Sequence, residues 1–366
     1  MKKHTLTCAI LFLTACVIPA VTGCSRNDDP EVLPGEILPA PDGDDGTLFI
    51  LNEGNFQYSN ATLSIYNPEK REVTDEAFIK ANGMKLGDVA QSMTIYGDRG
   101  WIVVNNSNVI FAIDPTTLKE KGRIENLTFP RYIHFVSDTK AYVTQLWDNR
   151  IAIINPQTYQ ITGHIDVPDM KPGSGSTEQM VSYGDFVYCN CWSYQKRIIK
   201  IDTRSDEVVA SLEVGIQPNS LALDCNGKLW TVTDGGFEGS PFGYEAPALV
   251  KIDAETFKIE NKFSFSLGDS CSEICLNGEK DRLYWINDDI WEMDVTASAP
   301  PSAPLLKAGD TLYYGLTVAP VSGDIYVADA IDYQQNGIIY RYSRDGKLID
   351  HFNAGINPGA FCWYIP

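Results

Sequence analysis

Polar side chains recur at two fixed positions of a repeated segment and are the residues best suited to ligand chemistry. One set ends a short apolar strand: Asn52, Asn105, Gln145, Asn190, Asn287 and Asp329. A second set begins the strand before it: Gln91, Arg131, Glu178, Asn219, Ser272 and Tyr314. Neutral amides both donate and accept hydrogen bonds, so the two sets suit a large polar ligand with amides or hydroxyls of its own. The competing interpretation is that an Asn at a strand end caps the backbone of its own loop.

Aromatic residues form a third set, in the longer loops that follow the strand-end amides. They are Phe56, Tyr58, Trp147, Trp192, Tyr194, Phe237, Phe242, Tyr244 and Tyr333. Rigid rings supply a large contact area at a low entropic cost, which is what a binding surface requires. We expect part of the set to pack under its own loops instead, Phe242 and Tyr244 first.

Signals for catalysis are weak. The chain contains no G-x-S-x-G, H-E-x-x-H, phosphate-binding or dinucleotide-binding glycine pattern. Glu53, Arg131, Glu178 and Glu273 could act as acid, base or oxyanion partner, but no pattern marks one of them as catalytic. We therefore expect a binding protein without catalytic residues, metal or cofactor, and a lactonase-like or lyase-like enzyme is the alternative.

Two strand motifs that recur seven times must position these residues. The first includes Phe49-Ile50-Leu51-Asn52 and Ile102-Val103-Val104-Asn105, and the second ends in turns such as Asp114-Pro115 and Asn155-Pro156. Residues 47–366 number 320, or about 46 per repeat, a period typical of β-propellers. The sequence predicts an all-β, seven-bladed β-propeller with four-stranded blades rather than a β-sandwich or β-helix.

The ends of the repeat region predict how the ring closes. An inner strand such as residues 217–223 is missing before Thr47 and reappears as residues 357–363, so the C-terminal segment should supply the inner strand of blade one. Strands alternate in direction, so the aromatic loops and the starts of the inner strands share one face, here called the top face. The turns of the opposite, bottom face are short and almost free of aromatics.

The N-terminal residues predict export. Lys2 and Lys3, an apolar stretch from Leu6 and the ending Val21-Thr22-Gly23-Cys24 indicate a signal peptide over residues 1–23, with lipidation at Cys24 favoured over Cys16. Residues 24–46 then form the lipidated Cys24 and an acidic, Pro-rich tether. A protein anchored in this way lies just off a membrane and touches it only through the Cys24 lipid. The acidic Asp28-Asp29 pair resembles the surface-export signal of Bacteroidetes lipoproteins, which implies the outer membrane and exposure on the cell surface, and an ordinary acidic linker is the alternative.

Charge and cysteine content narrow the partners further. The chain has 48 Asp and Glu against 29 Lys and Arg, a formal charge of −19, which excludes nucleic acid as a partner. Beyond Cys24 six cysteines remain, and their pairing stays open. Cys225 and Cys275 fall near corresponding strand ends of neighbouring blades and are a pair to test.

Most repeats have a strand that ends in Asn, followed by a second strand that ends in a turn such as Asp-Pro-Thr. Over residues 47–366 this pattern resembles that of the YncE-like seven-bladed propellers. Together with the Cys24 motif, the acidic Asp28-Asp29 pair and Leu51-Asn52-Glu53-Gly54-Asn55, it is similar to the BtuG-type surface lipoproteins of Bacteroidetes within that family. The resemblance implies capture of cobalamin (vitamin B12) as a bound ligand and transfer to a TonB-dependent transporter of the BtuB type. No short motif identifies the ligand, and a surface glycan is the second candidate.

Overall fold

The computed structural model describes residues 45–171 and 173–366. The predicted signal peptide, Cys24 and nearly all of the tether lie outside these residues. The described part contains 27 strands, one short α-helix, α1 (Ala77–Asn82), and one 3-10 turn, η1 (Asn105–Ser107). No helix in it is long and apolar enough to cross a membrane.

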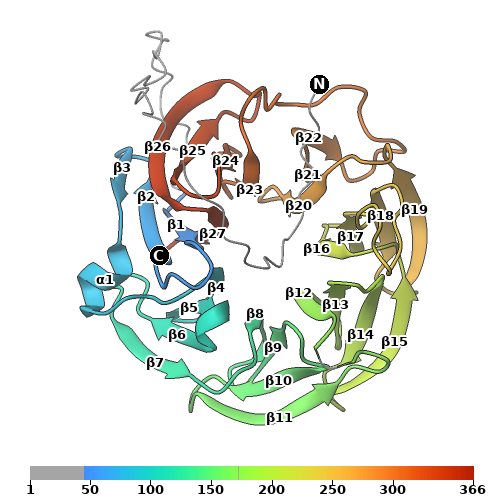
Figure 1. Cartoon of the computed structure of the whole chain (residues 1–366), viewed down its shortest axis with the longest axis horizontal. Helices are drawn as coiled ribbons and strands as arrows, with labels where there is room; N and C mark the ends of the chain where they lie inside the picture. The colour runs from blue at the N-terminus through green and yellow to red at the C-terminus, as the bar shows by residue number, and fades with distance from the viewer. Residues whose placement is uncertain (1–44, 172) are drawn as a thin grey trace, which may run out of the picture. The chain divides into compact units, whose positions relative to one another are not determined.

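The strands form seven antiparallel sheets that stand as blades around a common centre (Figure 1). Blade one holds β27 (Pro358–Tyr364), β1 (Thr47–Asn52), β2 (Thr62–Asn67) and β3 (Glu72–Thr74). Blade two holds β4 (Ala90–Tyr96), β5 (Arg99–Val104), β6 (Val109–Ile113) and β7 (Glu120–Ile124). Blade three holds β8 (Pro130–Ser137), β9 (Lys140–Gln145), β10 (Arg150–Asn155) and β11 (Gln160–Asp166).

The other blades follow in chain order. Blade four holds β12 (Ser176–Tyr183), β13 (Phe186–Trp192), β14 (Arg197–Asp202) and β15 (Glu207–Glu213). Blade five holds β16 (Pro218–Leu223), β17 (Lys228–Thr233), β18 (Ala248–Asp253) and β19 (Lys258–Ser264). Blade six holds β20 (Cys271–Leu276), β21 (Arg282–Asn287) and β22 (Asp289–Asp294), and blade seven holds β23 (Tyr313–Val318), β24 (Ile325–Asp329), β25 (Asn336–Tyr342) and β26 (Leu348–Ile356).

Ring closure by the C-terminal segment is confirmed. Strand β27 pairs antiparallel with β1, from Thr47 opposite Tyr364 to Asn52 opposite Pro358. The innermost strand of blade one therefore comes from the end of the chain, and the rest of that blade comes from the start of the repeat region.

Blade six departs from the predicted four strands, because it has three. The place of an outer strand in the sequence is taken by residues 297–312, which include Pro300, Pro301 and Pro304. Proline has no N–H to donate to a strand ladder, so this segment adds no strand; it meets β22 through the isolated bridge between Ile290 and Leu306 and a few neighbouring bonds, such as that from the Ala308 N–H to Asp289.

The apolar core lies between the blades. Alternate residues of a strand point to opposite faces of its sheet, so each blade contributes to two clusters. In β1, Phe49 and Leu51 pack against blade two, whereas Leu48 and Ile50 pack against blade seven. Seven such clusters hold neighbouring blades together, and they fix the positions of the inner strands around the channel.

Candidate ligand-binding site at the channel mouth

All seven inner strands carry a β-bulge close to their first residue, at the top end of the channel. The pairing register skips one or two residues there in every blade. The skipped residues, called the bulge ring below, are Gln91, Arg131, Tyr132, Glu178, Gln179, Asn219, Glu273, Tyr314 and Gly359. A bulge redirects a side chain out of the regular pleat and often lies beside a functional site. In blade six the skipped residue is Glu273, one position after the Ser272 expected from the sequence.

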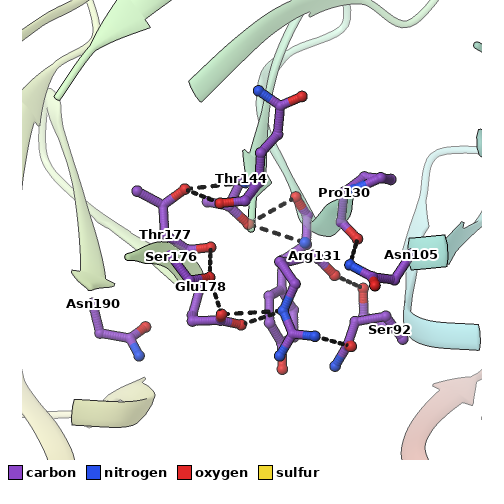
Figure 2. A network of polar contacts seen from close by, with 12 residues as sticks. Ser92, Asn105, Pro130, Arg131, Thr144, Ser176, Thr177, Glu178 and Asn190 are labelled. Carbon is purple, nitrogen blue, oxygen red and sulfur yellow. Dashed lines mark hydrogen bonds and ion pairs between the residues drawn. The ribbon is translucent and has the colours of Figure 1, made fainter. Parts of the chain in front are cut away.

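Arg131 links three blades in this ring (Figure 2). Its Nε donates to both carboxylate oxygens of Glu178, at 2.8 Å and 3.1 Å, and its Nη1 donates to the amide oxygen of Gln91. The hydroxyl of Ser176 donates to Glu178 as well. Because Glu178 is only 2% exposed, this ion pair is shielded from water and its geometry is fixed.

Glu53 occupies the place where blade one has no bulge side chain. The residue skipped in that blade is Gly359, and a Cβ added there would lie 2.6 Å from Oε1 of Glu53. The hydroxyl of Tyr314, from blade seven, donates to Glu53 at 3.0 Å. The missing side chain of Gly359 therefore lets a loop carboxylate reach the ring.

The guanidinium of Arg131 pairs with Glu178, and its charge also acts on the carboxyl groups of Glu53 and Glu273. Burial, followed by the charges of Glu53 and Glu178, raises the pKa of Glu273 to about 7. Burial also raises the pKa of Glu53, against the hydrogen bond from Tyr314 and the charge of Arg131. The site therefore presents Glu273, whose pKa is about 7, beside the ion pair of Glu178 and Arg131, which is a set able to bind polar groups or to transfer a proton.

The predicted strand-end set lies beside this ring and bonds with the protein itself; all of it is buried except the half-buried Asn287. The amide N–H₂ of Asn105 donates to the carbonyl of Pro130 at 3.0 Å, and that of Asn190 donates to the carbonyl of Pro218 at 2.7 Å. Each of these bonds joins one blade to the next. The others serve nearby polar groups: Asn52 donates to Thr62 and Ser64, Gln145 to the Arg150 carbonyl and Asn287 to Asp269, and Asp329 accepts from the Leu312 and Ile331 N–H groups. Only Gln145 and Asp329 bond the backbone of their own loops, as the capping interpretation expects.

The aromatic loops form a rim on the same face. Within residues 45–171 and 173–366, the aromatic side chains with more than about a third of their surface exposed are Phe56, Tyr58, Trp147, Tyr194, Phe237, Phe242 and Tyr244. All seven lie in loops between the second and third strands of a blade. The predicted asymmetry between the two faces is therefore present, and Phe242 is exposed, not tucked under its loop.

Two of the predicted rim residues are half-buried. The Trp192 indole N–H donates to Asp234 at 2.9 Å, and Tyr333 packs edge-on against Tyr314 with 5.6 Å between ring centroids. Trp147, Tyr194 and Tyr333 all have a left-handed backbone, with φ of 61°, 64° and 63°. Bulky residues rarely adopt this conformation, and its persistence in three rim loops is typical of functional surfaces.

Below the bulge ring, a cavity of about 430 Å³ lies among the inner strands β4, β8, β12 and β16. Tyr132, His134 and Gln179 contribute to its lining. Burial lowers the pKa of His134 to about 4, so this imidazole is neutral at physiological pH. The channel thus continues beneath the charged ring as a less charged compartment.

The cysteines add no covalent link in the described part of the chain. Cys189, Cys191, Cys225, Cys271, Cys275 and Cys362 are all free, so the pair suggested for Cys225 and Cys275 is not formed. Across residues 45–171 and 173–366 there is also no cluster of three or more His, Cys, Asp or Glu arranged to hold a metal ion.

Solved structures share the fold at low identity. A quinonprotein alcohol dehydrogenase-like protein from Bacteroides thetaiotaomicron is 15% identical, with 87% of this chain and 78% of that chain covered and a TM-score of 0.67. A candidate 6-phosphogluconolactonase from Bacteroides uniformis is 12% identical, with 87% and 99% covered and a TM-score of 0.63. Another candidate 6-phosphogluconolactonase, from Bacteroides fragilis, is 11% identical, with 87% of this chain and 98% of that chain covered and a TM-score of 0.62. These matches show the propeller fold and fit a YncE-like propeller.

The family is shown by a sequence match. No curated protein is similar enough to match. Residues 45–359, which span all seven blades, match the profile of a domain of unknown function, DUF5074. The chain therefore belongs to the DUF5074 family.

Proposed function

We propose that this protein captures a large polar ligand on its top face, with cobalamin as the preferred ligand. The observation that carries the proposal is the exposed aromatic rim, which lies at the same end of the channel as the bulge ring and gathers side chains from several blades. Rings at the edge provide contact area, and the polar groups further in provide orientation.

Cobalamin matches this arrangement because it is large, flat and edged with amide side chains. The strand-end amides use their N–H₂ groups within the protein, whereas the side-chain oxygens of Asn52, Asn190 and Asn287 have no hydrogen-bond partner among the residues that the structure describes. In this proposal the bulge ring supplies most of the hydrogen bonds to the ligand. Arg131 offers its remaining N–H groups as donors, Asn219 offers its side-chain oxygen, unpartnered within the described ranges, as an acceptor, and Glu273 offers either, according to its protonation. In this proposal the Cys24 lipid holds the protein on the cell surface, and the ligand passes to a TonB-dependent transporter of the BtuB type.

Titration calorimetry with cyanocobalamin tests the proposal directly. We expect saturable binding that weakens about tenfold in Trp147→Ala, because an exposed anchor ring is lost. Val321→Ala, which removes an exposed apolar side chain from a bottom-face turn, is the control and should bind as the unaltered protein does. No heat of binding at micromolar protein would exclude cobalamin and leave a surface glycan as the ligand to test.

A second candidate function is acid–base catalysis at the same ring. The observation that favours it is Glu273, whose pKa is raised to about 7 by burial and by the charges of Glu53 and of the arginine-paired Glu178. Two solved propellers of this fold are candidate 6-phosphogluconolactonases, which makes lactones the substrates to assay first. Turnover of a lactone that disappears in Glu178→Gln would favour the enzyme over the capture protein.

A further inference from the structure

A second pocket lies outside the channel, on the outer side of blade four. Its volume is about 530 Å³, and it is bounded by the β13–β14 loop, the outer strand β15 and the long β17–β18 loop. Tyr194 and Phe242 from the two loops stack on each other, with ring centroids 4.2 Å apart and ring planes 27° apart. Both rings are more than a third exposed, so they form an apolar platform open to solvent.

The two loops that carry the platform are fastened together from below. Buried Gln217 donates through its side-chain N–H₂ to Asp234, at 2.9 Å and 3.0 Å. Asp234 also accepts from the Trp192 indole, and the Gln217 side-chain oxygen accepts from the Tyr194 N–H. One buried network therefore fixes the bases of both loops, and binding at the platform needs little further ordering.

Glycine lets the longer loop come close enough to complete the platform. A Cβ at Gly243 would lie 2.8 Å from Cδ1 of Ile216, and the backbone there has φ of 108°. The absence of a side chain allows the loop to rest on Ile216, which lines the pocket next to Phe242. Ser193 and Tyr194 opposite are both left-handed, with φ of 32° and 64°. The left-handed backbone of both loops therefore directs the Tyr194 and Phe242 rings toward each other.

The polar lining mixes donors and acceptors with balanced charge. Lys196 and Arg197 supply two positive charges, and Asp169 and Glu213 supply two negative charges. Lys196 is already paired with Glu213 at 2.6 Å, and Arg197 donates to the carbonyl of Pro168. Gln195 and Ser211 add a neutral amide and a hydroxyl. A free anion or cation gains little from such a lining, whereas a ligand rich in hydroxyls can both donate and accept.

We propose that this pocket is a binding site for a neutral saccharide, separate from the channel mouth. A pyranose ring presents a face of C–H groups to the Tyr194–Phe242 platform and a rim of hydroxyls to Gln195, Ser211 and Glu213. The pocket volume falls within the range of small-ligand sites and accommodates a disaccharide. Tyr194 and Phe242 are also rim residues, so this proposal assigns these two rings to the saccharide and leaves the other rim residues to the ligand at the channel mouth.

The test is saturation-transfer NMR, followed by calorimetry, of the full chain with maltose, lactose, cellobiose and N,N′-diacetylchitobiose. We expect at least one disaccharide to bind with a Kd of about 1 mM or tighter, and Phe242→Ala to weaken it about tenfold. Val209→Ala is the matched control, because Val209 is exposed on the same strand β15 as Ser211 and Glu213 but does not line the pocket. That variant should bind as the unaltered protein does.

Three outcomes would overturn the proposal. The first is that none of the four disaccharides binds saturably. The second is that Trp147→Ala abolishes saccharide binding while Phe242→Ala leaves it intact, which would place the sugar at the channel mouth. The third is that Phe242→Ala removes binding of cyanocobalamin and of the disaccharide together, which would make the two sites one. A failure of cyanocobalamin binding alone would leave the saccharide site standing.

Discussion

The strand-end set and the bulge ring lie at adjacent positions of paired strands at the channel mouth, but they have different roles. Strand-end residues such as Asn105 and Asn190 are buried and donate to the backbone of the next blade. Bulge-ring residues such as Arg131 and Glu273 leave the regular pleat and influence carboxylates of other blades across the channel. Residue type alone therefore does not assign a role here, because the bulge decides which polar groups are available to a ligand.

The sharpest test of this contrast removes the cation of the bulge ring. Arg131→Met leaves the Glu178 carboxylate buried without its partner, so we expect a loss of about 3 kcal/mol or more in the free energy of unfolding. Chemical denaturation measures it. Adding Glu178→Gln should recover part of the loss, since no charge then stays unpaired. A change below about 1 kcal/mol would mean that water reaches the pair.

The strand-end ring should respond in stability alone. Asn190→Ala removes a buried hydrogen bond and leaves the Pro218 carbonyl without this donor, which should cost about 1–3 kcal/mol. Cyanocobalamin binding should be unchanged when measured well below the melting temperature. Gln91→Ala in the bulge ring is the contrasting variant, because it should weaken ligand binding more than stability. Equal effects of both variants on binding would erase the distinction between the rings.

Protonation of the bulge ring should appear in the pH dependence of stability. Glu273 has a pKa of about 7 in the folded protein, above the ordinary value of about 4.3. The folded state therefore holds a proton that the unfolded state loses between these values, and stability falls as pH rises from about 4 to about 7 and then levels off. Glu273→Gln should match the unaltered protein near pH 5 and exceed it at pH 8 by on the order of 1 kcal/mol. Denaturation curves with the same offset at both pH values would show that Glu273 is ionised throughout.

The smallest stability effect is expected at the rim. Trp147 is 44% exposed, so Trp147→Ala should change the free energy of unfolding by no more than about 0.5 kcal/mol, as measured by thermal melting. Trp192→Ala should lower stability more, because it removes the indole bond to the half-buried Asp234. The reverse order would show that Trp147 is a packing residue and would weaken the capture proposal.

The architecture could be predicted because its signals are local. Alternating apolar strands, Asn or Asp before Pro, and a repeat of about 46 residues predict seven blades, and the displaced segment at residues 357–363 predicts the closure. Pro300, Pro301 and Pro304 lie where the outer strand of blade six would be, and proline disfavours a strand at that place.

The details of the site could not be predicted in the same way. Strand register depends on two paired segments, so the bulges could not be predicted from either segment alone. In blade six the repeat pattern predicts Ser272 as the channel residue, whereas the bulge displaces Glu273. The place of Glu53 depends on the absence of a side chain at Gly359, about three hundred residues away in the chain. Burial of the strand-end amides depends in turn on the neighbouring blade, which no single repeat contains.

The pairing of β1 with β27 also constrains how this protein is made. During synthesis the first blade leaves the ribosome without its innermost strand and must wait for nearly the whole chain before it can be completed. Until then the edge of β1 and the apolar residues on both of its faces are open to wrong partners. A polypeptide that lacks its last ten residues lacks β27, so its ring stays open and its β1 edge stays unpaired. Such a product should be less stable and more prone to aggregate than the full chain.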